Sequence, residues 1–398
     1  MRKTRAYSTF AALALLLGAC GDDPEPAAPP APQVDVAKLD SGNYPTAPLD
    51  VESTRTAMSG ALRESIRIAA ASPTPYDYDN RFVFAARPGH AVTAEAPPWY
   101  PGTDFENGKD TSAAIPGVVA GWETAGQRRE EFNAGREIDT MVVRYETADQ
   151  ARFAADEIGK RTKGVPGPAI PDHPEVQTRV DINKGSYTTQ YLRAWLLRGD
   201  LLIHASLSDP ISIPFDAAAD ADIVKRFFDK QLELLASYKP TPVADFGKLP
   251  LDVDGLLAHT LPAKTKESEG AAYPVQAVLH LAGSRRDKLI AAITDAGIDY
   301  ASFAGGSVFR ARDADAAIRY MVAEATDSTT EDHMKVDGPA DMPGAECYNA
   351  KPEVKYASDA PPMCITTIGR YVIKSQSMNL QDAQQQLAAQ YKLLHGFS

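Results

Sequence analysis

The sequence predicts an α+β protein with two related domains, each an antiparallel sheet with helices packed on one face. The first observation is a repeat: a strand, a capped helix, a hairpin and a terminal helix occur twice in the same order. The second is a Pro-containing segment, residues 239–250, that separates the two copies. The third is composition, because 44% hydrophobic and 24% charged residues are typical of a globular protein.

The repeat begins with a strand that leads into a helix. Residues 141–146 have the pattern of a strand, and the helix that follows them carries Ala151. Residues 307–312 have the same pattern, and their helix carries Ala316. In both copies Thr or Asp stands where an N-terminal cap is needed. We therefore expect corresponding strand–helix units in the two domains.

A hairpin and a terminal helix complete each copy. Residues 195–205 and 365–375 each contain two apolar runs around a Gly-containing turn, which is typical of a hairpin. Helical patterns over 222–238 and 381–394 follow. Because four elements recur in order with similar turn residues, duplication is favoured over chance.

These patterns give the domain boundaries. We expect an N-terminal α+β domain over residues 44–245 and a C-terminal α+β domain over residues 246–398. Within the first domain, the spacing of apolar residues predicts a helix over 51–71 and a strand over 81–86.

The N-terminus carries the pattern of an export signal. Arg2, Lys3 and Arg5 precede an apolar run over residues 10–19, which is too short to span a bilayer core of about 30 Å. We expect residues 1–19 to be a signal peptide that is removed from the mature protein.

The end of this signal resembles the lipobox of bacterial lipoprotein precursors. The motif is Leu17-Gly18-Ala19-Cys20, with small residues before the Cys. The resemblance implies that Cys20 is acylated, in the manner of palmitate anchors, and that the chain is held at the extracytoplasmic face of the cell membrane. An ordinary signal peptide is the alternative. Residues 20–43, rich in Pro and Ala, then read as an extended tether.

Charge restricts the class of partner. The formal net charge is −12, and removal of residues 1–19 with their three basic residues makes it −15. An acidic chain without a long Lys/Arg run repels phosphate backbones, so we expect no nucleic-acid partner. No other apolar run approaches the roughly 18 residues that a membrane span needs.

Two cysteines remain after Cys20 is assigned. In an exported protein the pair Cys347 and Cys364 predicts a disulfide. Two free thiols are the alternative, and metal binding is weaker because no second Cys pair accompanies them.

Motifs that carry chemistry are absent from the sequence. Ser307 lacks the final Gly of a hydrolase nucleophile motif and begins a strand instead of ending one. The seven His are scattered singly, and His204 and His280 read as half-buried structural residues in apolar stretches. Neither Gly-rich phosphate-binding loop occurs. We therefore predict no catalytic residue, no metal ligand and no cofactor.

Aromatic residues cluster with Pro and Gly in the first domain. Trp99, Tyr100 and Trp122 are the candidate ligand-binding residues, because exposed aromatic rings stack on sugars or on partner proteins. The same rings would otherwise close the edge of the core, which is favoured because aromatic side chains are usually buried.

Several segments together carry a family resemblance. They are the lipobox, Leu249-Pro250-Leu251-Asp252, the Cys347/Cys364 pair, and the C-terminal stretches Gly369-Arg370-Tyr371-Val372 and Ala388-Ala389-Gln390-Tyr391. With them the chain resembles a family of uncharacterised cell-envelope lipoproteins of mycobacteria, nocardiae and related actinobacteria. The resemblance implies a membrane-attached, outward-facing protein with two α+β domains, and it implies no activity.

The functional hypothesis follows from the predicted location. We expect a non-enzymatic ligand-binding or structural lipoprotein that is attached to membrane lipid. It would hold a cell-wall or lipid ligand, or an envelope protein, in a groove between its domains or at the Trp99 and Trp122 loops. The alternative is a cell-wall hydrolase or transferase that uses carboxylates, whose spacing is spatial and not visible in a sequence.

Overall fold

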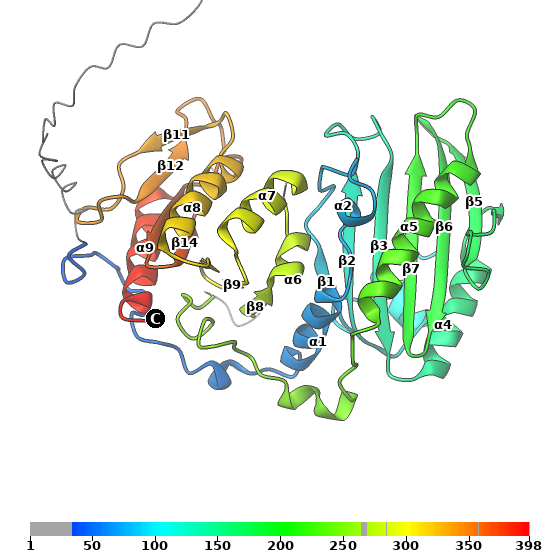
Figure 1. Cartoon of the computed structure of the whole chain (residues 1–398), viewed down its shortest axis with the longest axis horizontal. Coiled ribbons are helices and arrows are strands. Elements are labelled where there is room, and N and C mark those ends of the chain that lie inside the picture. Colours follow the sequence, from blue (N-terminus) through cyan, green and yellow to red (C-terminus); the bar gives the residue numbers. More distant parts are fainter. Residues whose placement is uncertain (1–33, 264–268, 284, 357, 398) are drawn as a thin grey trace, which may run out of the picture. The chain divides into compact units, whose positions relative to one another are not determined.

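A computed structural model describes residues 34–263, 269–283, 285–356 and 358–397 (Figure 1). The predicted signal peptide, Cys20 and most of the predicted tether lie outside the described residues. None of the helices in the described segments combines the length and the apolar character needed to cross a bilayer.

Two seven-stranded antiparallel sheets form the framework. The strands of the first sheet are β1 (His90–Val92), β2 (Val118–Gln127), β3 (Glu137–Tyr145), β4 (Val165–Pro166), β5 (Gln177–Lys184), β6 (Thr188–Arg198) and β7 (Leu201–Asp209). The strands of the second sheet are β8 (Ala271–Pro274), β9 (Tyr300–Phe303), β10 (Ser307–Arg310), β11 (His333–Val336), β12 (Glu346–Ala350), β13 (Met363–Ile368) and β14 (Tyr371–Gln376).

Helices surround both sheets. The first half contains η1 (Val51–Thr54), α1 (Ser59–Ala70), α2 (Pro75–Tyr78), α3 (Gly108–Ala114), α4 (Ala148–Arg161) and α5 (Ala217–Leu235). The segment after it contains η2 (Val243–Lys248), and the second half contains α6 (Val275–His280), α7 (Arg286–Ala296), α8 (Ala314–Ser328) and α9 (Leu380–Leu394).

The two sheets have the same topology. The first has the strand order β1-β2-β3-β7-β6-β5-β4, and the second, read from β8, has the order β8-β9-β10-β14-β13-β12-β11. Each strand of the second sheet thus corresponds to the strand seven places earlier in the chain. The predicted fold class, two related α+β units with antiparallel sheets, is confirmed.

Local capping explains why the repeated helices begin where they do. The Thr147 hydroxyl accepts a hydrogen bond from the backbone N–H of Gln150 (3.2 Å) at the start of α4. The Asp313 carboxylate accepts one from the N–H of Ala316 (2.8 Å) at the start of α8. Each cap satisfies an N–H group that has no partner within its helix.

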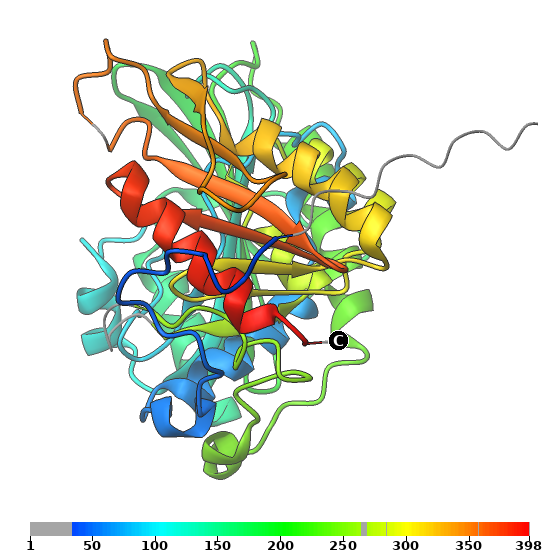
Figure 2. The same ribbon diagram turned by 90° about the vertical axis from the view of Figure 1, so that its left-hand side faces the viewer.

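The predicted placement of helices on one face needs a correction, because both faces of each sheet are covered. In the first sheet, Ile138 and Val142 pack with α1 and α5, whereas Val143 packs with α4. In the second, α7 and α8 pack on one face and α9 on the other (Figure 2). Neighbouring strand residues point to opposite faces, so apolar residues at successive positions bury both.

Two further elements differ from the sequence prediction. The helix expected over 51–71 is divided, because η1 ends at Thr54 and α1 starts at Ser59. The Ser59 hydroxyl accepts a hydrogen bond from the N–H of Thr56 (2.8 Å), which favours a local turn over a continuous helix. The stretch 81–86 forms no strand, and only Phe84 makes isolated bridges, to Gln127 and Arg285.

The end of the predicted tether lies against helix α9. Leu39 is buried, and its carbonyl accepts a hydrogen bond from Lys392 Nζ (2.8 Å). Gln385 Nε2 donates to the carboxylate of Asp40 (2.9 Å). Residues 34–43 therefore belong to the packed structure, because Leu39 supplies apolar surface to it.

The predicted disulfide is confirmed between Cys347 and Cys364. The two residues lie directly opposite each other on β12 and β13, and both are fully buried.

The two halves contact each other through α6 and α7. The His280 ring hydrogen-bonds with the hydroxyl of Thr124 in β2 and with the carbonyl of Ser72. The backbone N–H of Arg286 donates to the carbonyl of Val83 (2.8 Å). The start of α7 is thereby placed beside the segment that follows α2.

Candidate functional site

The three predicted aromatic residues do not form one exposed surface. Tyr100 is fully buried, and its hydroxyl lies 3.2 Å from that of Tyr145. Trp122 is 2% exposed and its ring contacts Tyr273 and His280. Only Trp99 is accessible, at 46%, and its indole N–H donates to the Phe105 carbonyl (3.1 Å). Two of the three rings therefore pack in the interior, as aromatic side chains usually do.

The two histidines singled out in the sequence are more deeply buried than expected. Burial, together with the charge of Arg193, lowers the pKa of His204 to about 3. Burial and the charge of Arg286 lower the pKa of His280 to about 3, against the raising effect of its backbone hydrogen bond to Ser72. Both imidazoles are thus neutral at pH 7. Within the described residues, no group of three or more His, Cys, Asp or Glu is arranged to hold a metal ion.

A pocket of about 530 Å³ lies where the start of α7 meets the first half, and we call it the arginine pocket. Five arginines line it together with three apolar residues and a glycine, and the lining contains no acidic residue. The lining residues are Arg81, Val83, Phe84, Arg128, Arg129, Gly135, Arg136, Ile211 and Arg285.

The hairpin between β2 and β3 supplies three of the five arginines. The backbone N–H of Arg128 donates to the carbonyl of Arg136 (3.0 Å), which closes the loop between the strands. Arg128 and Arg136 consequently lie opposite each other at the neck of the loop, with Arg129 beside them. Asn133 has a φ of 60°, a left-handed conformation that Asn tolerates better than most residues.

Asp79 is a buried carboxylate that pairs with several arginines at once. Its side chain is 3% exposed and lies 2.7 Å from Arg81, 2.6 Å from Arg128 and 2.9 Å from Arg226. Burial opposes ionisation, but the hydrogen bonds from Arg81 and the charge of Arg128 outweigh it and hold the pKa of Asp79 well below its usual value. Asp79 therefore stays charged and fixes the positions of these guanidinium groups.

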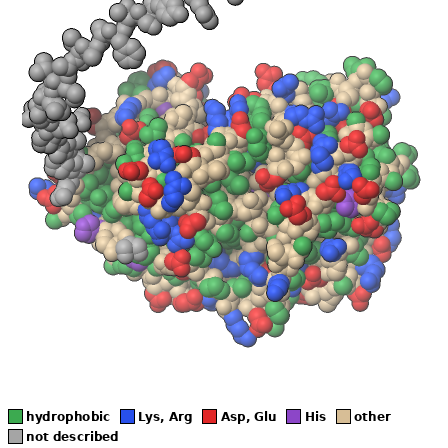
Figure 3. Space-filling model, in the orientation of Figure 1, with side chains coloured by type: hydrophobic (Ala, Val, Ile, Leu, Met, Phe, Trp, Pro, Cys, Tyr) green, Lys and Arg blue, Asp and Glu red, His purple; other side chains and the backbone are tan. Residues whose placement is uncertain are grey.

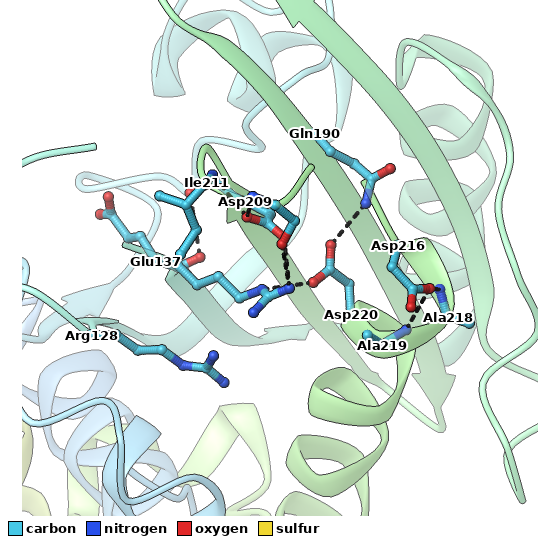
Figure 4. A network of polar contacts seen from close by, with 12 residues as sticks. Arg128, Glu137, Gln190, Asp209, Ile211, Asp216, Ala218, Ala219 and Asp220 are labelled. Atoms are coloured by element: carbon cyan, nitrogen blue, oxygen red, sulfur yellow. Dashed lines mark hydrogen bonds and ion pairs between the residues drawn. The ribbon is translucent and has the colours of Figure 1, made fainter. Parts of the chain in front are cut away.

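Asp209 and Asp220 hold Arg136 in the same manner. Both carboxylates are fully buried and lie 2.7 and 3.0 Å from its guanidinium. Asp209 also accepts from the N–H of Ile211, and Asp220 accepts from Gln190 Nε2 (Figure 4). Burial raises the pKa of Asp220, whereas hydrogen bonds and Arg136 lower that of Asp209 despite its burial.

Two of the guanidinium groups lie over the faces of aromatic rings. Arg128 lies 4.8 Å from the centre of the Phe82 ring, and Arg285 lies 5.1 Å from that of Phe84. Arg285 Nε also donates to Asp287 (2.8 Å). A planar guanidinium held by a ring and a carboxylate has few alternative conformations.

The lining of the pocket is positive although the chain is acidic. The five lining arginines and Arg226 face the carboxylates of Asp79, Asp209, Asp220 and Asp287, which leaves an excess of two positive charges. The exposed Glu130 and Glu131 of the β2–β3 loop bring the local balance to zero, against −12 for the whole chain. Figure 3 shows Lys and Arg side chains gathered in patches on one face.

The side chains that a ligand can reach from solvent carry more positive charge than this balance indicates. The carboxylates of Asp79, Asp209 and Asp220 are 0–3% exposed and lie behind the arginines. Arg129 is exposed and has no ion-pair partner in the part of the chain that the structure describes. An incoming anion therefore meets guanidinium groups first.

This arrangement suits anion binding better than acid–base chemistry. Arginine stays protonated in proteins and presents N–H donors in a fixed fork that matches phosphate and carboxylate groups. The pocket was not predicted from the sequence because its residues come from separate segments. The only local signals were the doublets Arg128-Arg129 and Arg285-Arg286.

A second charged cluster lies on β2 and β3 and contains two carboxylates. The Arg87 guanidinium pairs with both Glu123 and Asp139, at 2.6 Å from the latter. Burial raises the pKa of Asp139 to about 7, against the lowering effect of Arg87. A carboxyl group with such a pKa is able to exchange a proton near neutral pH.

Comparison with known proteins identifies a family but no function. No curated protein matches the chain. Among solved structures, the extracellular domain of PknH from Mycobacterium tuberculosis is similar at 13% identity, over 42% of this chain and 96% of that one, with a TM-score of 0.28. Family models described as the N-terminal and C-terminal parts of a domain of unknown function, DUF7373, match residues 51–251 and 256–396, so the chain belongs to the DUF7373 family.

Proposed function

We propose that this protein is a binding lipoprotein of the bacterial cell envelope, and that it binds an anionic ligand in the arginine pocket. Its location would follow from acylation of Cys20 at the extracytoplasmic face of the membrane. The Leu17-Gly18-Ala19-Cys20 motif and the basic, then apolar, N-terminus support this location. The C-terminal motifs support an origin in the actinobacterial envelope.

One observation carries the binding function. Five arginines line a single pocket, while the buried carboxylates that hold three of them lie behind and do not reach the lining. Because these guanidinium groups are already held in place, less free energy is lost in ordering side chains when a ligand binds. A phosphate or carboxylate group would receive charge-assisted hydrogen bonds from several guanidinium groups at once.

Calorimetric titration of the purified protein with inorganic phosphate tests this proposal. Arg129→Gln removes one lining charge without breaking an ion pair, so we expect it to weaken phosphate binding about tenfold, the loss of one charge-assisted hydrogen bond. Arg198→Gln is the matched control, because Arg198 is an exposed arginine at the end of β6 that has no ion pair among the described residues and does not line the pocket. Absence of phosphate binding, or an equal loss in both variants, would refute the proposal.

A carboxylate hydrolase or transferase is the second candidate, and the Glu123–Asp139 pair is the observation that favours it. Arg87 pairs with both carboxyl groups, and that of Asp139 has a pKa of about 7. Two neighbouring carboxyl groups of this kind suit the roles of general acid and general base. Incubation with isolated peptidoglycan would then release soluble fragments, and Asp139→Asn would abolish the release. If the wild-type protein releases none, this candidate fails.

A further inference from the structure

A second hollow adjoins the arginine pocket, and Arg285 lines both. It has a volume of about 480 Å³ and lies between α7 and α8. Its apolar lining consists of Leu289, Ala292, Ala323 and the ring of Tyr320. A charged pocket and a largely apolar hollow thus share one arginine.

The second hollow extends along α7, away from the other arginines. Leu289 and Ala292 are three residues apart, which places them on one face of α7, and Arg285 is the N-cap residue of this helix. Ala292 follows Arg285 by seven positions, about 10 Å along the axis. Apolar side chains therefore follow Arg285 along α7, with Lys288 beside them in the lining.

Small residues leave the space between the two helices open. Ala292 on α7 and Ala323 on α8 both line the hollow and are partly exposed. Tyr320 forms its floor, because it is 1% exposed and its hydroxyl donates to Glu324 (3.2 Å). Larger side chains at the two alanines would fill the hollow.

A third hollow, of about 410 Å³, shares part of its lining with the second. Its lining is mixed: Phe303, Phe309 and Met363 of the second sheet are apolar, whereas Lys374 and Gln376 are polar. Two apolar or aromatic residues and two carboxylates line both hollows: Leu289, Tyr320, Glu324 and Asp327.

The charge of Glu324 is compensated within the wall of the hollow. Its carboxylate accepts hydrogen bonds from Lys374 Nζ and from the Ser328 hydroxyl (3.1 Å), in addition to that from Tyr320. A carboxylate with three donors, one of them a cation, repels a neighbouring anion or apolar chain much less than an unpaired one would.

We propose that these three neighbouring hollows, which share lining residues, together bind one anionic amphiphile. Its phosphate or carboxylate head lies among the arginines, and its hydrocarbon chain passes Arg285 and follows the α7–α8 hollow toward Phe303 and Phe309. The inference rests on the proposed function, because it names the class of the anion bound there. The amphiphile is taken as a single molecule, and a bilayer surface is not the ligand.

Three probes separate the contribution of the anionic head from that of the hydrocarbon chain. They are inorganic phosphate, octyl phosphate and octyl glucoside, each used below the concentration at which it forms micelles. The probes are titrated into residues 20–398 carrying Cys20→Ala and made without the signal peptide, a protein that has neither an acyl anchor nor the apolar N-terminal run. Each methylene removed from water strengthens binding about fourfold, so four buried methylenes make octyl phosphate more than a hundredfold tighter than phosphate. Octyl glucoside, which lacks the anion, binds more weakly than octyl phosphate.

Two variants at neighbouring residues test where the hydrocarbon chain of the ligand binds. Ala292→Trp fills the hollow and removes the advantage of octyl phosphate, while phosphate affinity is unchanged. Ala291→Trp is the matched control, because Ala291 is the preceding residue of α7, is exposed and does not line the hollow. Should Ala292→Trp fail to fold, Ala323→Trp on α8 blocks the same space.

The outcomes distinguish the two proposals. If phosphate binds and octyl phosphate binds no tighter, or if both Trp variants have the same effect, the amphiphile inference is wrong and the anion site stands. If neither phosphate nor octyl phosphate binds, the proposed function itself fails. Binding to phosphatidylglycerol vesicles without binding of octyl phosphate would also contradict the inference.

Discussion

The buried carboxylate of Asp79 lies 2.6 Å from the guanidinium of Arg128, and the same carboxylate also holds Arg81 and Arg226. One negative charge therefore fixes three positive ones, and two of these face the arginine pocket. An unpaired cluster of guanidinium groups would repel itself, so the buried carboxylate is what allows the arginines to lie together.

Replacement of this carboxylate should destabilise the protein. Asp79→Asn leaves three guanidinium groups without their counter-charge, and we expect the free energy of unfolding to fall by about 3 kcal/mol. Urea unfolding measures this loss. The control is Asp149→Asn, which breaks an exposed pair with Arg152 and should cost less than about 1 kcal/mol. Equal losses in the two variants would contradict the role given to Asp79.

Buried His280 should make stability depend on pH. Its pKa of about 3 in the folded protein is below the usual value near 6.5, so between these values the unfolded chain binds the proton and stability is lost as the pH falls. From pH 7 to pH 5 this group should contribute a loss of about 2 kcal/mol. His280→Gln should lack that part of the loss when urea unfolding is compared at the two pH values. An identical pH dependence in both proteins would refute the assignment.

The disulfide should stabilise the second half of the chain. Cys347 and Cys364 are 17 residues apart, and closing a loop of this length is worth about 3 kcal/mol in the chain-entropy model. We expect the double variant Cys347→Ala/Cys364→Ala to lose about this amount in urea unfolding. A loss below about 1 kcal/mol would show that the bridge contributes little. Thiol titration of the unfolded, unreduced wild-type protein should detect neither residue.

The proposed anchor depends on Cys20, which lies outside the described residues. Cys20→Ala should abolish incorporation of a fatty-acid probe and leave the precursor without lipoprotein-type cleavage. Cys347→Ala is a useful control, because it changes a cysteine far from the N-terminus and should leave the labelling intact. Normal labelling of the Cys20 variant would refute the anchor.

The repeated strand–helix and hairpin–helix units could be predicted because their signals are local. Caps such as Thr147 and Asp313 act within one turn of helix, and apolar periodicity is visible in a short window. The coverage of both sheet faces was missed although a signal was present. Five of the seven residues over 201–207 are apolar, including three in succession, and such a run is typical of a strand covered on both sides.

The arginine pocket could not be predicted in the same way. Arg81, Arg136 and Arg285 come from three segments of the chain, and only the contact of the start of α7 with Val83 and Phe84 places Arg285 near the others. Helix and strand propensities and the spacing of apolar residues give no information on contacts between residues so far apart in sequence. Which of the aromatic candidates are buried could not be predicted for a related reason, since Tyr100 and Trp122 are buried by partners remote in sequence.

Nuclear magnetic resonance of the arginine side chains tests most directly whether the arginine pocket receives an anion. In a protein labelled with nitrogen-15, titration with inorganic phosphate should shift the Nε–H signals of Arg129 and Arg285, which line the pocket, and leave that of Arg152 on α4 unchanged. Unchanged signals from Arg129 and Arg285 at saturating phosphate, or shifts that are uniform across all exposed arginines, would contradict the account.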